Sequence, residues 1–476
     1  MGGFAEHFNA PVGRGHVPDG AATGAAGGAA CGDLVRVSVA VENERVADAG
    51  FDASGCGAAL AAGSAAVALV RGRALLDALR VGSDDIAAEL GGLSPGKRHA
   101  AELAADALAR ALGASARADA RLAPEPGRVL VAMSGGVDSA VAALLETRAG
   151  SEVAAVTLEL WADPANDGER SCCSAQAVRG ARALAHGMGI PHLTLDLREE
   201  FRAGVVQPFL DDHAAGRTPN PCVRCNGHVR LDAMLELAAR LGAGAGLATG
   251  HYARVRDGLL HTAADPAKDQ SYMLAATAPA TLARLRFPLG ELTKPEVRAL
   301  AAEAALPVAS KADSQDLCFL AGTDRASFLA RHGGQHGRAG EIVRRDGRVL
   351  GRHRGHQHYT VGQRRGLGIA ATEPLYVLAT DATSNRVTVG ARADLRAERV
   401  VVSAATLYRD GSAVDRVKLR YRSRALPARV VGAPAAGAHS RLELALDEPV
   451  DGAAPGQTAC LMAGDAIVGH ATIARP

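Results

Sequence analysis

A short glycine-rich loop is the feature of this sequence that most clearly suggests chemistry. It reads Ser134-Gly135-Gly136-Val137-Asp138-Ser139 and follows the apolar run 128–133, which is typical of a buried parallel strand. The glycines let backbone amides approach an anion closely, and a helix that starts at or near Ser139 adds positive potential. The hydroxyls of Ser134 and Ser139 can donate to phosphate oxygens, whereas Asp138 needs an intervening cation. We therefore expect a phosphate group here, with Mg²⁺ bridging Asp138 and pyrophosphate.

Other readings of this loop fit less well. A bare Gly-Gly pair would be an ordinary turn, but the full string between a strand and a helix favours phosphate binding. The stretch nearest to a Walker loop, 91–97, is followed by Arg98 where Ser or Thr is required. The loop resembles that of the PP-loop ATP pyrophosphatases, which implies ATP cleavage between the α and β phosphates and adenylation of a substrate. That family includes tRNA thiolases, GMP and asparagine synthetases and argininosuccinate-type ligases, and the loop alone does not choose among them.

The cysteines narrow the choice. Cys222 and Cys225 form a Cys-x-x-Cys pair in a loop stiffened by prolines, and nearby arginines would favour thiolates. Cys318 supplies a further thiol. Sulfur insertion needs one thiol that carries persulfide sulfur and another that releases it by forming a disulfide. A zinc knuckle and inert buried cysteines are the alternatives, although no second ligand pair at knuckle spacing is present.

Together these strings resemble the tRNA-specific 2-thiouridylases (MnmA, or TrmU in eukaryotes) from Arg128 to the C-terminus. The resemblance implies ATP-dependent thiolation of the wobble uridine, position 34, in the tRNAs for Lys, Glu and Gln. The motifs that carry it are 132–139, 218–226, 248–252, 268–272, 313–319, 359–368 and 418–421.

The resemblance also assigns roles to individual residues. Cys318 matches the cysteine that receives the persulfide, and Cys225 matches the nucleophile that closes the disulfide. The expected ATP-binding residues are Ala132, Met133, Ser134, Gly135, Gly136, Val137, Asp138, Ser139, Leu158 and Gly250. The expected tRNA-binding residues are Asn220, Pro221, Cys222, Lys268, Asp269, Gln270, Arg420 and Tyr421, with the segment 220–222 facing the target base.

Position 222 departs from the family pattern, because many relatives carry Asp where this chain has Cys222. The departure puts a proposed carboxylate role in proton or metal chemistry in doubt. It also creates a set of three thiols, Cys222, Cys225 and Cys318. Such a set could hold a [4Fe–4S] cluster whose open iron binds the transferred sulfur.

Residues 1–113 form a separate front unit. The strings around Cys31, Cys56 and His99 resemble the iron–sulfur scaffold proteins of the NifU and IscU type. In those proteins three cysteines plus an Asp or His assemble a cluster, but here the third cysteine position holds Ala100. The remaining candidates, Cys31, Asp33, Cys56 and His99, could hold zinc or a labile cluster. The alternative is a docking module that recruits a cysteine desulfurase or a sulfur-relay protein and raises its effective concentration.

Composition sets wider bounds. The chain has 476 residues and a formal net charge of +2, so it lacks a strong global field for nucleic acid. The stretch 331–365 is locally basic, with nine Arg against two acids, and the family resemblance favours a tRNA-facing role over a solvated loop. Neither a long apolar run nor a signal peptide is present, so we expect a cytoplasmic protein without a membrane partner. Reduced thiols are expected there.

The elements that must position these residues follow from periodicity. We expect a strand pair over 34–46 and helices over 58–71, 74–79 and 99–112 in an α+β front domain. Alternating strands and helices then predict a doubly wound α/β domain with a parallel sheet. Short Val-rich segments after about 335 predict small antiparallel β modules that end in a C-terminal β-barrel. The expected domains are 1–113, a linker 114–127, 128–334, 335–395 and 396–476.

The combined expectation is a tRNA-uridine 2-sulfurtransferase that uses ATP and Mg²⁺ and releases AMP and pyrophosphate. One alternative is an iron–sulfur or sulfur-trafficking protein, and another is a different ATP-dependent ligase with the same loop. The intact Asp138 argues against the first, and Cys225 and Cys318 would be unexplained in the second.

Overall fold

The computed structural model describes residues 3–27, 32–118, 121–163, 174–312 and 317–475. The chain divides into two compact units, each of which is described by itself. The first unit comprises Met1–Arg198, Asp232–His251 and Arg284–Cys318, and the second comprises Glu199–Leu231, Tyr252–Ala283 and Phe319–Pro476. Among the described residues, no helix has both the length and the apolar character that a membrane crossing requires.

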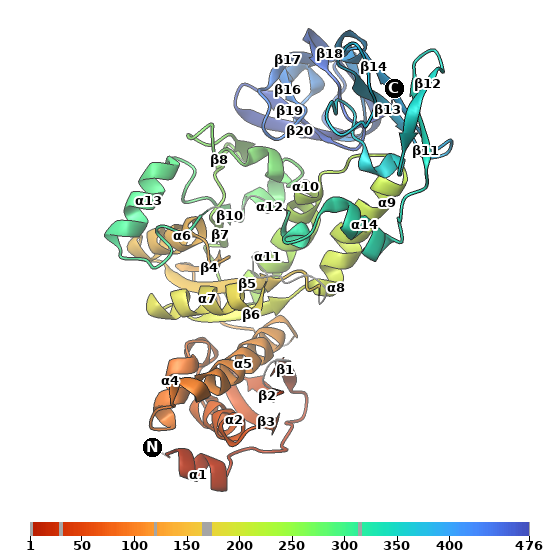
Figure 1. Cartoon of the computed structure of the whole chain (residues 1–476). Helices are drawn as coiled ribbons and strands as arrows, with labels where there is room; N and C mark the ends of the chain where they lie inside the picture. The colour runs from red at the N-terminus through yellow and green to blue at the C-terminus, as the bar shows by residue number, and fades with distance from the viewer. Residues whose placement is uncertain (1–2, 28–31, 119–120, 164–173, 313–316, 476) are drawn as a thin grey trace. The chain divides into compact units, whose positions relative to one another are not determined.

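The front part of the first unit is a three-stranded antiparallel sheet, in the order β1-β2-β3, covered by helices (Figure 1). The predicted strand pair is confirmed, with Val35, Val37 and Val39 fully buried. The sequence Ala-Thr-Gly-Ala-Ala-Gly of β1 carries none of the usual strand signal and was not predicted. The elements are α1 Phe4–Asn9, β1 Ala22–Gly27, β2 Leu34–Glu42, β3 Arg45–Ser54, α2 Gly57–Val70, α3 Leu75–Ala78, α4 Ser83–Glu89 and α5 Arg98–Ala118.

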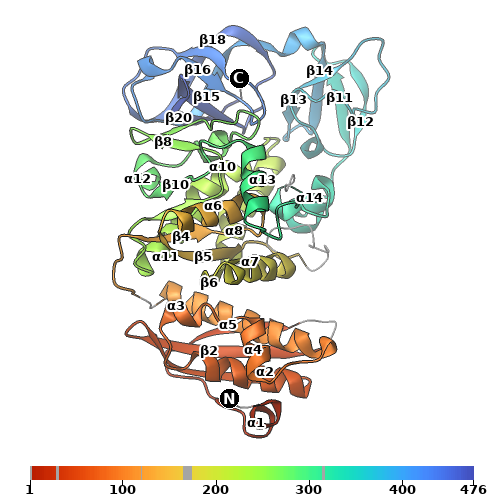
Figure 2. The ribbon, with the colours of Figure 1, turned by 90° about the vertical axis from the view of Figure 1, so that its left-hand side faces the viewer.

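Helix α5 continues through residues 114–118, which were predicted as part of a linker. It contacts β1 and β2 on one side and a strand of the second sheet, β6, on another. Figures 1 and 2 show α5 between the two sheets of the first unit.

The rest of the first unit is a parallel sheet with strand order β10-β7-β4-β5-β6, as predicted for a doubly wound domain. Its strands are β4 Arg128–Ala132, β5 Glu152–Glu159, β6 His192–Asp196, β7 Leu247–Thr249 and β10 Leu285–Arg286. Its helices are α6 Val137–Arg148, α7 Ala175–Gly187, α11 Leu231–Arg240 and α13 Lys294–Glu303. The glycine-rich loop leaves the carboxyl end of β4, and α6 begins at Val137 rather than at Ser139.

The second unit contains a helical part that carries the Cys-x-x-Cys pair. Two short segments in it are π-helical, a geometry that is often found at functional sites. The helices are α8 Arg198–Phe201, η3 Arg202–Val206 (π), α9 Gln207–Ala214, α10 Pro221–Cys225, η4 Asn226–Arg230 (π), α12 Pro279–Leu282 and α14 Arg325–Gly333.

The second unit also holds two β-sheets, which confirms the predicted β modules. The smaller has the order β12-β11-β14-β13, with β11 Gly340–Arg344, β12 Val349–His353, β13 Tyr376–Asp381 and β14 Arg386–Gly390. It is not wholly antiparallel, since β11 and β14 run parallel. The larger sheet closes as a six-stranded barrel because β15 pairs with both β18 and β20.

The barrel strands are β15 Arg396–Leu407, β16 Arg416–Lys418, β17 Leu426–Val430, β18 Gly437–Asp451, β19 Thr458–Ala463 and β20 Ala466–Ile473. Its core includes Val402, Val417, Leu444 and Leu461, all fully buried. A hairpin from much earlier in the chain, β8 Arg254–Arg256 and β9 Leu259–His261, extends the sheet through β20. The hairpin therefore ties the 268–272 segment, which follows it, to the barrel.

Candidate functional site

The glycine-rich loop is shaped by its own serines. The backbone N–H of Ser134 donates to Ser139 Oγ at 3.1 Å, and the Ser139 hydroxyl donates to the carbonyl of Gly136 at 3.1 Å. Ser139 is buried, whereas Ser134 is exposed. In this conformation the Ser139 hydroxyl stabilises the turn, and the Ser134 side chain is exposed to solvent. Gly136 caps α6 with no side-chain hydrogen bond, so the first amides of the helix have no capping side chain.

Two lysines that the sequence reasoning did not identify flank this loop. Lys294 Nζ donates to both carboxylate oxygens of Asp138, at 2.7 and 2.9 Å. Lys311 Nζ donates to the carbonyl of Gly135 at 2.8 Å. The Lys294 ammonium therefore lies beside Asp138, the residue that was predicted to bind Mg²⁺.

The sequence around Lys294 gives only a weak indication that this lysine has a role at the loop. It is the first residue of α13, where Thr293 and Glu296 form a capping box. A cation is disfavoured at the positive end of a helix, so a buried Lys at this position calls for a reason outside the helix. Asp138 is that reason, 156 residues away in the sequence.

Close backbone approaches explain the glycines of the predicted nucleotide site. Gly135 has a φ of +69°, and a Cβ there would lie 3.3 Å from the Ala177 carbonyl on α7. A Cβ at Gly250, just after β7, would lie 2.8 Å from the backbone of Asp138 and Ser139. Leu158, near the carboxyl end of β5, is buried. The first unit thus brings Gly250 against the loop and places Leu158 on a neighbouring strand, as expected of one nucleotide site at the carboxyl ends of the strands.

The predicted sulfur-handling cysteines fall in different units. Cys222 and Cys225 lie in α10 of the second unit, with Cys222 half-buried and Cys225 buried. Cys318 is half-buried and is the last residue of the first unit. Asn220 caps α10 by accepting from Val223 N, and Pro221 is the first residue of that helix, where a proline is preorganised. The pair therefore sits on a fixed helical turn.

The expected tRNA segments of the second unit meet around Tyr272. Its hydroxyl donates to the Thr458 carbonyl at 2.8 Å, and its side chain also hydrogen-bonds to Asn220. Burial raises the pKa of the Tyr272 phenol above its ordinary value, so the phenol stays protonated and acts as a neutral hydrogen-bond donor. The rings of Tyr272 and Tyr421 are 6.2 Å apart. Asn220, Tyr272 and Tyr421 therefore form one cluster at the start of α10.

The three residues Lys268, Asp269 and Gln270 differ in what their side chains do. Asp269 is buried and accepts hydrogen bonds from Ala263 N, Ser271 N and Lys418 Nζ. Gln270 Oε1 accepts from Tyr252 N at 3.0 Å. Lys268 is half-buried. Asp269 and Gln270 therefore hold the shape of this loop, and the Lys268 side chain is the member with partial access to solvent.

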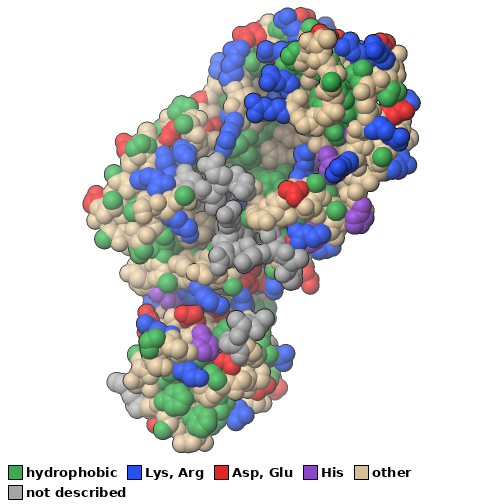
Figure 3. All heavy atoms as spheres, in the orientation of Figure 1, with side chains coloured by type: hydrophobic (Ala, Val, Ile, Leu, Met, Phe, Trp, Pro, Cys, Tyr) green, Lys and Arg blue, Asp and Glu red, His purple; other side chains and the backbone are tan. Residues whose placement is uncertain are grey.

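The other expected tRNA contacts lie at the edge of the barrel. Arg420 is exposed, and its guanidinium donates to the Gly452 carbonyl at 2.5 Å. The arginines at 345, 348, 352, 354, 364 and 365 are exposed as well. Figure 3 shows Lys and Arg side chains gathered over the part of the second unit that contains β11–β20. This surface of the second unit is basic although the whole chain is nearly neutral.

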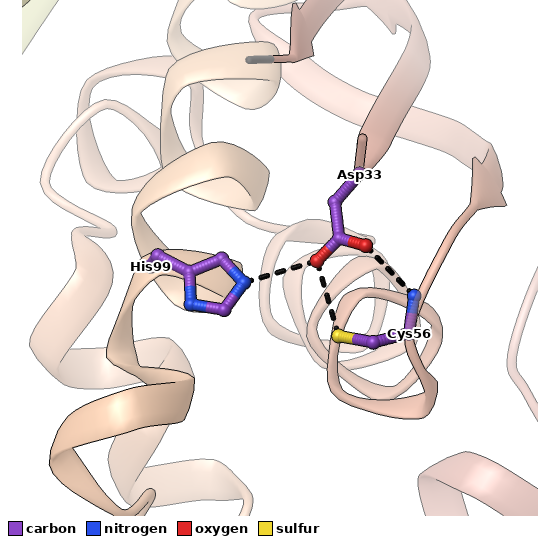
Figure 4. Close-up of side chains that lie close together, drawn as sticks. All are labelled: Asp33, Cys56 and His99. Atoms are coloured by element: carbon purple, nitrogen blue, oxygen red, sulfur yellow. Dashed lines mark hydrogen bonds and ion pairs between the residues drawn. The ribbon is translucent and has the colours of Figure 1, made fainter. Parts of the chain in front are cut away.

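In the front domain, the structure brings together three of the four predicted metal ligands (Figure 4). One ligand atom each from Asp33, Cys56 and His99 lies within 4.8 Å of the others. Asp33 Oδ2 accepts from Cys56 Sγ at 3.1 Å and lies 3.0 Å from His99 Nε2. Burial would raise the pKa of Asp33, but hydrogen bonds from Cys56 and His99 hold it below its ordinary value. We call these three residues the front triad.

The donor set of the front triad fits a metal ion. His99 Nδ1 lies 3.1 Å from the Gly96 carbonyl, an arrangement that orients a ligating imidazole and leaves Nε2 for the metal. One sulfur, one imidazole and one carboxylate suit zinc better than a cluster that prefers thiolates. Ala100 is fully buried and supplies no donor. Cys31, and residues 313–316 of the motif before Cys318, lie outside the described residues.

Family models match almost the whole chain. Residues 3–119 match the NifU-like N terminal domain, and 127–322 match the tRNA methyl transferase HUP domain. Residues 326–391 match the tRNA methyl transferase PRC-barrel domain, and 392–473 match the aminomethyltransferase beta-barrel domain.

One relative matches both the front domain and the rest of the chain, and others match the rest alone. The chain is 46% identical over 485 residues to the bifunctional protein NifU/MnmA of Rubrobacter xylanophilus, covering 99% of this chain and 97% of that protein. It is also 46% identical over 350 residues to the tRNA-specific 2-thiouridylase MnmA of Rhizorhabdus wittichii, covering 72% of this chain and 90% of that protein. The second match leaves out a portion of this chain about as long as the front domain.

Proposed function

Because the chain belongs to the tRNA-specific 2-thiouridylase family, in the form that carries a fused NifU-like domain, we propose that it replaces the C2 oxygen of a tRNA uridine with sulfur at the expense of ATP. The observation that carries the proposal is the loop 134–139, which follows the carboxyl end of β4 and is contacted by Lys294 and Lys311. We further propose that the target is the wobble uridine, position 34, of the tRNAs for Lys, Glu and Gln.

The first step is adenylation of the uridine. The loop amides and Ser134 bind the phosphates of ATP, and Gly250 and Leu158 border the adenine. The uridine O2 attacks the α phosphorus, the bond to the bridging oxygen breaks, and pyrophosphate leaves. Lys294 and Lys311 neutralise charge that develops on the phosphates. Magnesium, when bound with ATP, would be held by Asp138 and would also stabilise that charge.

The second step transfers sulfur. The terminal sulfur of a persulfide on Cys318 attacks C2, and AMP leaves with the former O2 oxygen. The thiolate of Cys225 then attacks the Cys318 sulfur, which breaks the S–S bond to the uridine and leaves sulfur on C2. The product disulfide, Cys225–Cys318, is reduced to two thiols by an external dithiol. A cluster held by Cys222, Cys225 and Cys318 is the alternative carrier, and it would leave no disulfide after turnover.

The second unit supplies the tRNA surface in this proposal. The start of α10, with Asn220, Pro221 and Cys222, receives the target base. Tyr421 lies beside Tyr272 and is influenced by the charges of Cys222 and Lys268, and Arg420 immediately precedes it in the chain. The exposed arginines of 345–365 contact the phosphate backbone.

The front triad is proposed to hold a metal ion, and the front domain to receive a cysteine desulfurase or sulfur-relay protein. Cys56 caps α2, so its sulfur sits at the positive end of a fourteen-residue helix. The Asp33 carboxylate accepts from the sulfur and is itself held by His99. The metal would fix these side chains together and keep the thiolate deprotonated.

The deciding experiment measures nucleosides. The full chain is incubated with unmodified tRNA, ATP and a persulfide donor, and the tRNA is digested for mass spectrometry. We expect 2-thiouridine with the wild type and none with Cys318→Ser, while tRNA-dependent pyrophosphate release persists in that variant. Thiolation by Cys318→Ser would remove the assigned role of that thiol. No 2-thiouridine with the wild type would overturn the proposal.

A further inference from the structure

Helix α5 of the front domain is buried on two sides, which is unusual for the last helix of a separate module. One side packs on β1 so closely that a Cβ at Gly24 would lie 2.2 Å from the Ala107 carbonyl. On the other side, a Cβ at Gly113 would lie 2.0 Å from the Thr194 carbonyl of β6. Strand β6 is the last strand of the parallel sheet. An uncovered edge strand is a liability, and here α5 packs directly against it.

A buried ion pair ties α5 to α7. Asp106 and Arg182 are both about 95% buried, at 5% and 6% exposure, and their charged groups are in direct contact. Arg179 Nε also donates to Asp106 at 2.7 Å, and Arg182 donates to the Ala105 carbonyl at 2.9 Å. Removing one partner of such a pair leaves the other partner as an uncompensated buried charge. The contact is therefore a fixed one rather than a transient encounter between domains.

A second ion pair ties α5 to β5. Arg110 donates through Nε and Nη2 to the two carboxylate oxygens of Glu159, at 3.1 and 2.5 Å. Its remaining nitrogen donates to the Ala25 carbonyl at 2.8 Å. Glu159 is the last residue of β5 and follows Leu158 of the proposed adenine pocket. This bidentate geometry fixes orientation as well as distance.

The backbone of the front domain reaches the nucleotide loop through a short chain of hydrogen bonds. The Leu79 carbonyl accepts from His192 N at 3.0 Å. The His192 ring donates to Thr157 Oγ1 at 2.8 Å, and the Thr157 hydroxyl donates to the Met133 carbonyl at 2.7 Å. Met133 immediately precedes Ser134. The chain of contacts runs through the interior from the front domain to the start of the loop.

The contacts of the front domain thus involve α7 and β5, the two elements that support one side of the loop. Helix α7 packs on Gly135 through Ala177 and Ala181, and β5 holds Met133. We propose that Asp106 and Arg110 are positioning residues for ATP, so that the front domain is a structural part of the adenylation site. The proposal rests on the proposed function, because it presumes that the loop binds ATP. Lys294 and Lys311 support the loop through separate contacts.

The energetic argument concerns the geometry of the loop amides. Anion binding by backbone N–H groups depends on their being fixed in advance, since reordering them on binding lowers affinity. Freeing α7 or the end of β5 would let the loop relax. The expected consequence is weaker ATP binding without loss of the residues that touch ATP.

The test compares ATP affinity in full-length variants. Arg110→Ala and Asp106→Asn are measured for ATP dissociation constant and for KM and kcat of tRNA-dependent pyrophosphate release, below their melting temperatures. We expect an increase of about tenfold in the dissociation constant and in the KM for ATP, with a smaller change in kcat, and Arg110→Lys in between. Arg98→Ala is the matched control, because Arg98 lies on the same helix as Asp106 and Arg110 and the variant removes only an exposed ion pair with Asp84 of α4.

The outcomes separate the two proposals. If the wild type binds no ATP, the proposed function fails. If the wild type binds ATP and Arg110→Ala binds it as tightly as Arg98→Ala does, only the positioning role is overturned. If Arg110→Ala and Asp106→Asn do not fold, Arg179→Gln tests the positioning role instead, because it keeps the buried Arg182–Asp106 pair. We expect about threefold weaker ATP binding for that variant, and affinity equal to the control would overturn the role.

Discussion

The nucleotide loop and the front triad are built on the same kind of backbone. Each lies where a strand passes into a helix, β4 into α6 and β3 into α2. Each turn has a glycine at positive φ, Gly135 at +69° and Gly55 at +124°. Each helix begins without a side-chain hydrogen bond at its cap. In the proposed function the two turns nevertheless receive ligands of opposite charge.

The difference comes from side chains delivered by other elements. Lys294 and Lys311 reach the nucleotide loop, whereas Asp33 and His99 reach the turn at Cys56. A Cβ at Gly55 would lie 2.0 Å from Asp33 Oδ1, so that glycine makes room for the carboxylate. The turn supplies backbone amides in both cases. The residues that arrive from elsewhere decide whether the site suits an anion or a cation.

The strongest test of this contrast removes a lysine from the nucleotide loop. Lys294→Ala leaves Asp138 without its ammonium partner beside the phosphates. We expect tRNA-dependent pyrophosphate release to fall by about a hundredfold, as for other preorganised charge-stabilising groups. Zinc binding by the front triad should not change.

Glu303→Ala is the control for that variant, because it removes an exposed ion pair with Arg148 at the end of the same helix. Exposed pairs contribute about 0–1 kcal/mol, so its activity should match the wild type. Equal activity of Lys294→Ala and Glu303→Ala would show that Lys294 has no part in ATP cleavage.

The loop could be proposed as a phosphate site from the sequence because its chemistry is local. The string 134–139 lies between a strand and a helix that are both visible as patterns. Lys294 was missed because its role depends on a contact across the sheet, to Asp138. Strand β1 was missed because its small residues serve close packing on α5 rather than strand propensity.

The junction between the front domain and the α/β domain could not be read from sequence either. An Ala-rich helix gives no sign that it is buried against two sheets. Deleting residues 1–113 therefore would not test sulfur delivery alone, because it removes Asp106 and Arg110 along with the triad. Point variants separate the two roles.

The next test changes the front triad instead of the nucleotide loop. His99→Ala removes the imidazole from the front triad, and we expect zinc affinity to fall by about tenfold or more. The measurement is a competition titration with a chromogenic chelator on the full chain. ATP affinity should remain at the wild-type value, since His99 lies at the first turn of α5, away from Asp106 and Arg110 in sequence.

Arg98→Ala is again a suitable control, one residue away and exposed. If His99→Ala and Arg98→Ala bind zinc equally, the imidazole is not a ligand. If the wild type binds no zinc at all, the front triad is a hydrogen-bonded cluster and not a metal site.

The smallest expected effect is a difference in how the stability of the two regions depends on pH. Burial, followed by the charges of Arg182 and His186, lowers the pKa of His192 well below the ordinary value of 6.5. Below pH 6.5 the unfolded chain therefore takes up a proton that the folded chain does not, and stability near β6 falls by at most about 1.4 kcal/mol per pH unit. The pKa of Asp33 is lowered from 3.8, so the contribution of the front triad is lost only at more acidic pH.

Hydrogen exchange at pH 7.5 and 5.5 can follow the two regions in one molecule. After correction for the intrinsic pH dependence of exchange, peptides from β5 and β6 should lose protection at pH 5.5, while those from β2 and β3 keep it. His192→Gln keeps a donor for Thr157 but does not titrate, so its β6 peptides should lose about 1 kcal/mol less than the wild type. Equal losses in wild type and variant would mean that other buried groups, such as His186, carry the acid sensitivity of this domain.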